Sequence, residues 1–255
     1  MVKILEYKRP GSELLLIDGD SFEPKNKERQ NFDKMGNKAV VKASQLIPLF
    51  PRTKIIPVPS WIVESVDEKV DDSDEDNEDG TSSRKIAASA LLGAHDNLVV
   101  YAVVDNHKCR ATIVNAAKNC NNIDVFLAGN DDGMYGTTYH YQIRDGVEVT
   151  CDPVAYHPEL ENPPDRNPGE LSCEERAQIE GGTQLVAINR MVAAVLLCQT
   201  QRNIIEGQPV GNSAATFFDM YSCEFMADSR PPSQDIEVIE GFAESESVDN
   251  HLSMS

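Results

Sequence analysis

The chain has 255 residues, 40% of them hydrophobic, which suffices for one large or two small domains with a buried core. Its formal net charge of −19 excludes general nucleic-acid binding, which needs a basic surface. The longest clean apolar run, MVAAVLLC, is too short to span a bilayer, and the first residues, MVKILEYKRPGSE, lack the apolar core of a secretory signal. We therefore expect a cytoplasmic protein without membrane or nucleic-acid partners.

The negative charge is concentrated in two segments. Residues 64–79 contain ten acidic residues and one lysine, and residues 228–255 contain seven acidic residues and one arginine. Such compositions do not bury a core. The sequence thus predicts a folded domain at 1–227, with a disordered acidic insert at 64–84 and a disordered acidic tail at 228–255.

The first elements in chain order are a strand, a helix and a second strand. Residues 13–18, ELLLID, predict a buried strand, and residues 36–49 predict a helix because apolar positions recur three and four apart. Residues 54–63, KIIPVPSWIV, predict another strand. Its two prolines favour a sheet edge or an irregular end.

After the acidic insert, helices and strands continue to alternate. Residues 84–95 predict a short helix, and residues 97–105, NLVVYAVVD, form an apolar run typical of a central parallel strand. A helix at 107–120 and a strand at 122–130 follow. This alternation indicates parallel strands joined by helices.

The last third of the chain mixes a hairpin, a loop and helices. Residues 139–152 predict an antiparallel hairpin that turns at Asp-Gly, and a proline-rich loop follows at 153–169. Helices are predicted at 172–180 and 183–202, with a late strand at 214–226.

These elements predict an α/β fold with a doubly wound, mostly parallel sheet. Ligands of such folds bind at the carboxyl ends of strands, where Asp18 and Asp105 both lie. Asp18 is placed to accept hydrogen bonds from ribose hydroxyls. Arg29 has a planar guanidinium suited to phosphate oxygens, and Lys38 lies near a helix start, where backbone amides also favour phosphate. Asp105 could bind Mg²⁺ through oxygen.

The same residues occur in a recognisable order. The pattern resembles the ThiF/MoeB family of adenylyltransferases, which are related to ubiquitin-activating enzymes, over roughly residues 13–200. In particular it resembles ThiF-family proteins of plasmid-borne PRTRC systems. The matching residues are Asp18, Asp20, Asn26, Arg29, Gln30, Gly36, Lys38, Asp105, Asn106, Arg110 and Asn115.

The resemblance implies a reaction, its cofactors and its partners. ATP and the C-terminal carboxylate of a small ubiquitin-like or sulfur-carrier protein would give an acyl adenylate and pyrophosphate, and the enzyme would be a homodimer. Asp18 would bind the ribose, with Asp20 and Gln30 in the same nucleotide-binding set. Asn26, Arg29 and Lys38 would bind the phosphates. Asp105 would bind Mg²⁺ and act in adenylation.

Cys173 lies in the crossing region where the family often has a nucleophilic cysteine. Because it precedes a predicted helix, its thiolate is a candidate to take the acyl group as a thioester. An inert small residue is an equal alternative for this thiol.

Two departures from the family pattern concern the nucleotide-binding loop and a structural metal. The family's first strand and glycine-rich loop do not precede the strand at 13–18, so we expect a fold in which they are missing or truncated. The two C-x-x-C pairs that hold a structural zinc in many members do not occur, so no such zinc is expected. The alternative function is therefore a catalytically inactive ThiF-like scaffold or partner-binding subunit.

Overall fold

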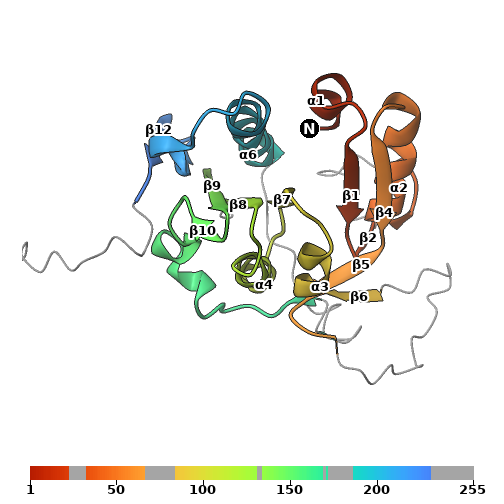
Figure 1. Cartoon of the computed structure of the whole chain (residues 1–255), viewed down its shortest axis with the longest axis horizontal. Helices are drawn as coiled ribbons and strands as arrows, with labels where there is room; N and C mark the ends of the chain where they lie inside the picture. The colour runs from red at the N-terminus through yellow and green to blue at the C-terminus, as the bar shows by residue number, and fades with distance from the viewer. Residues whose placement is uncertain (23–32, 67–83, 131–133, 169–170, 172–185, 231–255) are drawn as a thin grey trace, which may run out of the picture.

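The computed structural model describes residues 1–22, 33–66, 84–130, 134–168, 171 and 186–230. These residues form a mixed α/β structure, which confirms the predicted fold class (Figure 1). The elements in the first half of the chain are α1 (Val2–Lys8), β1 (Glu13–Ile17), β2 (Ser21–Phe22), β3 (Gly36–Asn37), α2 (Lys38–Leu46), η2 (Ile47–Leu49), β4 (Lys54–Val58), β5 (Ser60–Val63), β6 (Arg84–Ala87), α3 (Ala88–Gly93), β7 (Leu98–Ala102) and α4 (His107–Ala117). The remaining elements are β8 (Ile123–Asn130), β9 (Tyr135–Arg144), β10 (Val147–Glu148), η3 (Pro153–Ala155), η4 (Pro158–Leu160), α6 (Val186–Gln199), the π-helical η6 (Thr200–Ile205), η7 (Gly211–Ser213), β11 (Ala215–Asp219) and β12 (Glu224–Asp228).

The strands pair in parallel in the first half of the chain. The parallel pairs are β1 with β4, β5 with β6, and β7 with β8. Parallel neighbours need a long connection, and here the connections contain helices or the acidic insert. The predicted alternation of strands and helices therefore describes this half well.

The second half pairs antiparallel. One sheet has the order β12-β11-β9-β8-β7, with β10 paired to β9. The predicted hairpin is present, and its turn residues Asp145 and Gly146 have φ angles of 51° and 75°, as a type I′ turn requires. The sheet is thus parallel at β7–β8 and antiparallel from β8 to β12.

Three predicted elements differ in detail. The strand predicted at 54–63 divides around Pro59 into β4 and β5, which pair with different strands. The helix predicted at 84–95 begins only at Ala88, because the four residues before it form β6 beside β5. The strand predicted at 214–226 is a hairpin of β11 and β12, with Cys223 at φ 58° near its turn.

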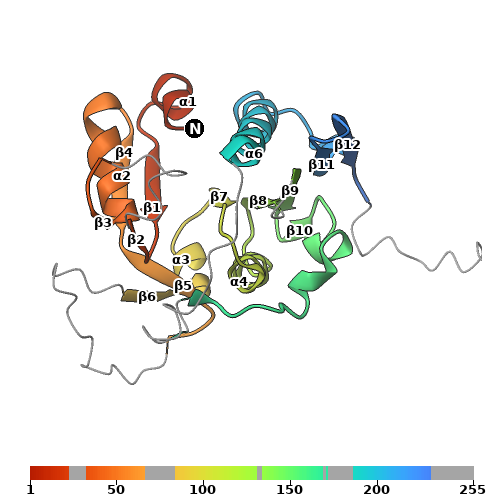
Figure 2. The same cartoon turned by 180° about the vertical axis from the view of Figure 1, so that it is seen from behind.

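The core lies on both faces of the larger sheet. Ile123, Val125 and Leu127 of β8 pack in a cluster with α3 and α4, whereas Phe126 and Ala128 pack with α6. This alternation is the period of two expected of a strand covered on both faces. Figures 1 and 2 show α4 and α6 on opposite sides of β7 and β8.

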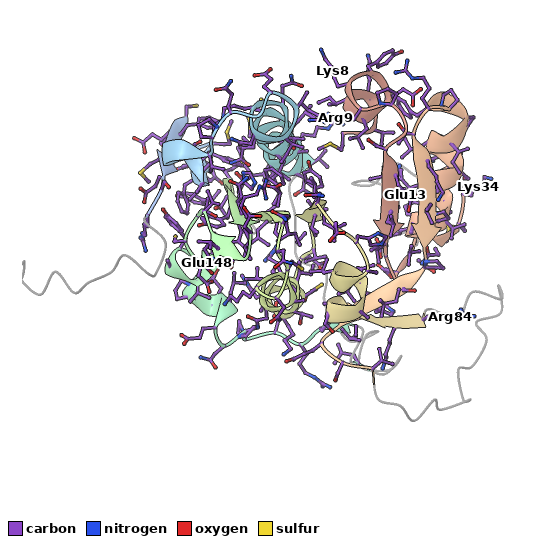
Figure 3. The ribbon with its side chains drawn as sticks, viewed as in Figure 1. Lys8, Arg9, Glu13, Lys34, Arg84 and Glu148 are labelled. Carbon is purple, nitrogen blue, oxygen red and sulfur yellow. The ribbon has the colours of Figure 1, made fainter. Side chains whose placement is uncertain are left out.

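A hydrogen bond links the C-terminal end of α1 to the π-helical segment that follows α6. The guanidinium of Arg9, labelled in Figure 3, donates to the carbonyl of Ile204 in η6 at 3.0 Å. In the part of the chain that the structure describes, no helix is long and apolar enough to cross a membrane. Most of the predicted insert and nearly all of the predicted tail lie outside the described residues, so those boundaries stay predictions.

Two strands have an open edge next to the predicted site. Within the described ranges, β1 is hydrogen-bonded only to β4 and β7 only to β8. The aliphatic side chains of both strands are mostly half-buried, although such continuous apolar runs are typical of central strands. Asp18 directly follows β1, and Asp105 follows β7 after two residues.

Candidate functional site

The turn after β1 is held by the start of α2. The backbone N–H of Asp20 donates to the Asp18 carboxylate at 2.9 Å. The side-chain amide of Asn37 donates to the carbonyls of Asp18 and Asp20 at 2.7 and 3.2 Å. Its oxygen accepts from the backbone N–H of Val40 at 3.2 Å and so caps α2. The buried Asn37 therefore joins the acidic turn to the helix that carries Lys38.

Gly19 lies against an aromatic ring. A Cβ atom at this position would lie 2.3 Å from the Trp61 ring, which is far inside van der Waals contact. The close approach of β5 to the turn therefore requires glycine at position 19.

Replacing Gly19 with alanine is expected to lower the free energy of unfolding by about 1–3 kcal/mol, because the Trp61 ring and the turn must move apart. Urea denaturation measures this change. Gly93→Ala is the matched control, since nothing lies within 4 Å of a Cβ there. Equal stability of the two variants would contradict the assigned contact.

Lys38 faces the acidic turn. Its backbone N–H donates to the Asp20 carbonyl at 2.9 Å, and its ammonium forms an ion pair with the Asp20 carboxylate. The Lys38 side chain is 15% exposed and that of Asp20 46% exposed. The ammonium is thus held at the start of α2, beside the end of β1.

Asp105 lies between β7 and α4, whose first turn is capped by other residues. The Asn106 side chain accepts from the backbone N–H of Cys109 at 2.7 Å. The Asp165 carboxylate accepts from the backbone N–H groups of His107 and Lys108 at 2.7 and 2.8 Å. Asp165 was not among the predicted site residues, because it comes from the proline-rich loop and no local pattern links it to α4.

Charges at the ends of β1 and β7 influence the pKa of Asp18. Burial raises the pKa of Asp18 above its ordinary value, and the charges of Asp20 and Asp105 raise it further. The backbone N–H of Asp20 and the ammonium of Lys38 act in the opposite direction. The structure therefore brings Asp18, Asp20 and Lys38 together, and the charge of Asp105 reaches Asp18. Four further predicted residues, Asn26, Arg29, Gln30 and Cys173, lie outside the described residues.

Arg110 of α4 is hydrogen-bonded to the loop that contains Asp105. Its guanidinium donates to the carbonyl of Val104, and the residue is 9% exposed. Burial lowers the pKa of Arg110, whereas the charges of Asp105 and Asp165 raise it. Burial also lowers the pKa of nearby His157, whose Nδ1 lies 3.2 Å from a Glu159 carboxylate oxygen.

A large cavity extends from this point along the antiparallel sheet. Its volume is about 1220 Å³, and Asp105, His107 and Arg110 line one part of it. The ends of strands β8, β9, β11 and β12 and the segment around η4 line the rest. No pattern in the sequence predicted this cavity, and its one local signal is the aromatic content of residues 214–226.

Comparisons with known proteins concern the fold. No family model matches the sequence, and no curated protein matches it either. Among solved structures, E. coli MccB with AMPCPP and selenomethionine MccA has a TM-score of 0.53 at 13% identity, over 87% of this chain and 57% of that one. E. coli MccB with ATP has a TM-score of 0.52 at 15% identity over the same shares of each chain.

A third similar structure, selenomethionine PaaA, has a TM-score of 0.52 at 14% identity over 85% of this chain and 64% of its own. The fold is Rossmann-like and similar to that of these structures. The chain spans less than two thirds of the length of these proteins. At such identities the likeness shows the fold alone.

Proposed function

We propose that the chain catalyses ATP-dependent adenylation of the C-terminal carboxylate of a small protein or peptide, of the ubiquitin-like or sulfur-carrier class. The observation that carries this proposal is the acidic turn of Asp18 and Asp20 after β1, which holds Lys38 at the start of α2 and feels the charge of Asp105 after β7. The fold supports it, because MccB structures of this type contain ATP, or AMPCPP together with MccA. A PRTRC-type relationship, a homodimer and a cytoplasmic location remain predictions.

Each residue of the cluster has a role that its chemistry suits. The Asp18 carboxylate accepts hydrogen bonds from ribose hydroxyls. Lys38 neutralises phosphate charge, and until then its ammonium is held by Asp20. Arg29, with Asn26 and Gln30, adds donors for phosphate oxygens.

The donor set also fits Mg²⁺. Among the residues that the structure describes, no group of three or more His, Cys, Asp or Glu side chains could hold a metal ion. Mg²⁺ in nucleotide sites is commonly bound by one or two carboxylates with phosphates and water, and the Asp105 carboxylate can provide such a ligand. Bound there, the ion would neutralise developing phosphate charge.

Adenylation needs positioning more than a covalent protein group. A carboxylate oxygen of the substrate attacks the α-phosphorus of ATP, the bond to pyrophosphate breaks, and pyrophosphate leaves with the electron pair. Lys38 and Arg29 stabilise the charge on the phosphates. In a second step, the Cys173 thiolate attacks the acyl carbon, and AMP leaves as a thioester forms.

The direct test is ATP–pyrophosphate exchange with a purified carrier that ends in Gly-Gly. Exchange that requires both the chain and the carrier carboxylate is the expected result. An inactive scaffold would instead bind the carrier without exchange. Binding without exchange, under conditions in which ATP also binds, would overturn the proposal.

Replacing Lys38 with methionine is expected to weaken ATP binding about 10- to 100-fold, because a charge-assisted contact to phosphate is lost. Calorimetric titration with ATP measures this affinity. Lys42→Met, on the same helix one turn later, is the matched control. If both variants bind ATP equally well, Lys38 does not contact the phosphates.

A further inference from the structure

The cavity beside Asp105 is larger than a small-molecule site requires. Pockets for small ligands typically measure about 300–1,000 Å³, and this one measures about 1220 Å³. It continues from the proposed adenylation site along β9, β11 and β12. Its size and direction suit several residues of an extended chain.

Aromatic residues line part of its wall: Tyr135, Tyr139, Tyr156, Phe217, Phe218 and Phe225. The rings of Tyr139 and Tyr156 have centroids 5.2 Å apart, and Tyr156 and Phe217 lie 6.1 Å apart. Farther along, Phe218 stacks on Phe225 at 5.6 Å. Such surfaces favour aliphatic and aromatic side chains of a ligand.

One residue of the wall, Gly136, shows how closely these rings approach the sheet. A Cβ on Gly136 would lie 2.3 Å from the Phe218 ring, so the ring rests directly on β9. Phe218 and Gly136 therefore form one closely packed part of the cavity lining.

The end of the cavity near Asp105 contains buried polar atoms without a hydrogen-bond partner. Within the described residues, the buried Nε of Arg110, Oγ1 of Thr137 and Nδ1 of His107 have no hydrogen-bond partner. All three residues line the cavity, and Arg110 is more than nine-tenths buried. Of these atoms, the Nε–H of Arg110 is always a donor, and a buried donor left unpaired is costly, so this end suits a ligand with carbonyl or carboxylate oxygens.

The remainder of the lining is acidic or apolar. Glu159, Asp219 and Glu224 line the cavity, and Arg110 is the one lysine or arginine among its described lining residues. Phe225 and Met226 of β12 are 55% and 63% exposed. The charges disfavour acidic side chains in a ligand, whereas the exposed apolar side chains favour an apolar one.

We propose that this cavity binds the last residues of the substrate that is adenylated, and that the residues just before its terminal carboxylate carry aliphatic or aromatic side chains. The oxygens of the tail meet Arg110 and Thr137, and its side chains lie on Phe217 and, farther along, on Phe225. This inference rests on the proposed function and adds the substrate's tail chemistry to it.

The test uses fluorescein-labelled decapeptides with identical sequences except for their ends. The three ends are Leu-Phe-Gly, Ser-Ser-Gly and Glu-Glu-Gly, each with a free carboxylate, and fluorescence anisotropy with the full chain measures binding without nucleotide. The apolar peptide is expected to bind at least about tenfold tighter than the serine peptide, from the burial of two large apolar side chains. Equal affinity of the apolar and serine peptides would overturn the proposal.

A pair of surface variants locates the binding. Phe225→Ser is expected to weaken binding of the apolar peptide at least about fivefold, whereas Tyr221→Ser should not. Tyr221 is 73% exposed on the same hairpin and does not line the cavity, so both changes remove an exposed aromatic ring. Unchanged peptide binding by the Phe225→Ser variant overturns the proposal. The proposal is also overturned if this variant loses self-association in light scattering but keeps peptide binding, because a second copy of the chain would then occupy the cavity.

The outcomes also separate this inference from adenylation. Selective binding of the apolar peptide without any pyrophosphate exchange would leave the cavity assignment standing and remove the proposed reaction. Pyrophosphate exchange that proceeds equally with the apolar and serine peptides would support the proposed reaction and remove the cavity assignment.

Discussion

Replacing Asp105 with alanine is expected to lower the rate of ATP–pyrophosphate exchange about 100- to 1,000-fold, the usual cost of losing one group that stabilises the transition state. The carboxylate lies at the junction of the Asp18 turn and the cavity, where the nucleotide and the substrate carboxylate would meet. Because Asn106 and Asp165 cap α4, the helix start keeps its capping bonds in this variant.

Two measurements make this prediction specific to catalysis. ATP binding measured without Mg²⁺ should be retained in the Asp105→Ala variant, because in the absence of the ion the Asp105 charge repels Asp18 and phosphate. Asp96→Ala is the control, since Asp96 is exposed in the loop before β7. Exchange at the wild-type rate in the Asp105→Ala variant would remove the role assigned to this residue.

The largest expected effect on stability is at Asp124. Its carboxylate lies 2.8 Å from Nε2 of His140, and accepts from the side chains of Gln142 at 2.8 Å and Arg144 at 2.6 Å. His140 is fully buried and stacks on Phe126 with ring centroids 4.1 Å apart. Asp124→Ala should therefore lower the free energy of unfolding by about 3 kcal/mol, because it leaves buried polar groups without their partner.

Urea denaturation near neutral pH measures this loss. Asp96→Ala again provides a control, and its effect should stay within about 0.5 kcal/mol, as for most exposed positions. A similarly small effect of Asp124→Ala would show that the network contributes nothing to stability.

The same network predicts a pH dependence. Burial raises the pKa of Asp124, but the hydrogen bonds from His140, Gln142 and Arg144 outweigh it and hold this pKa below its ordinary value. The unfolded chain then binds the proton more readily, so the stabilisation is present above the unfolded pKa of about 3.9. It is lost as the pH falls through the lower, folded pKa, and Asp124→Ala should remove this part of the acid sensitivity.

Several elements were predictable because their signals are local. The apolar run at β7 and the helical spacing of α4 lie within single segments, and the Asp-Gly pair marks the turn between β9 and β10. Asp18 and Asp105 were recognised as strand-end residues for the same reason. Their mutual approach depends on tertiary packing, because among the described residues β1 and β7 belong to different sheets.

Other features depend on contacts between distant residues. β6 forms because β5 offers it an edge, although the local sequence of residues 84–95 favours a helix. The split at Pro59 and the hairpin of β11 and β12 likewise reflect pairing with particular neighbours. Propensity alone does not decide such cases, because tertiary contacts outweigh it.

The sequence by itself determined the α/β class, the order of most elements and the acidic residues at two strand ends, because periodicity and turn chemistry are encoded within a few neighbouring residues. Only the tertiary structure decided that Asp165, 58 residues from His107, caps α4. It alone also placed the aromatic residues of β9, β11 and β12 around one cavity beside Asp105. These arrangements arise from the packing of segments far apart in the chain, and no local pattern specifies which distant partner a side chain meets.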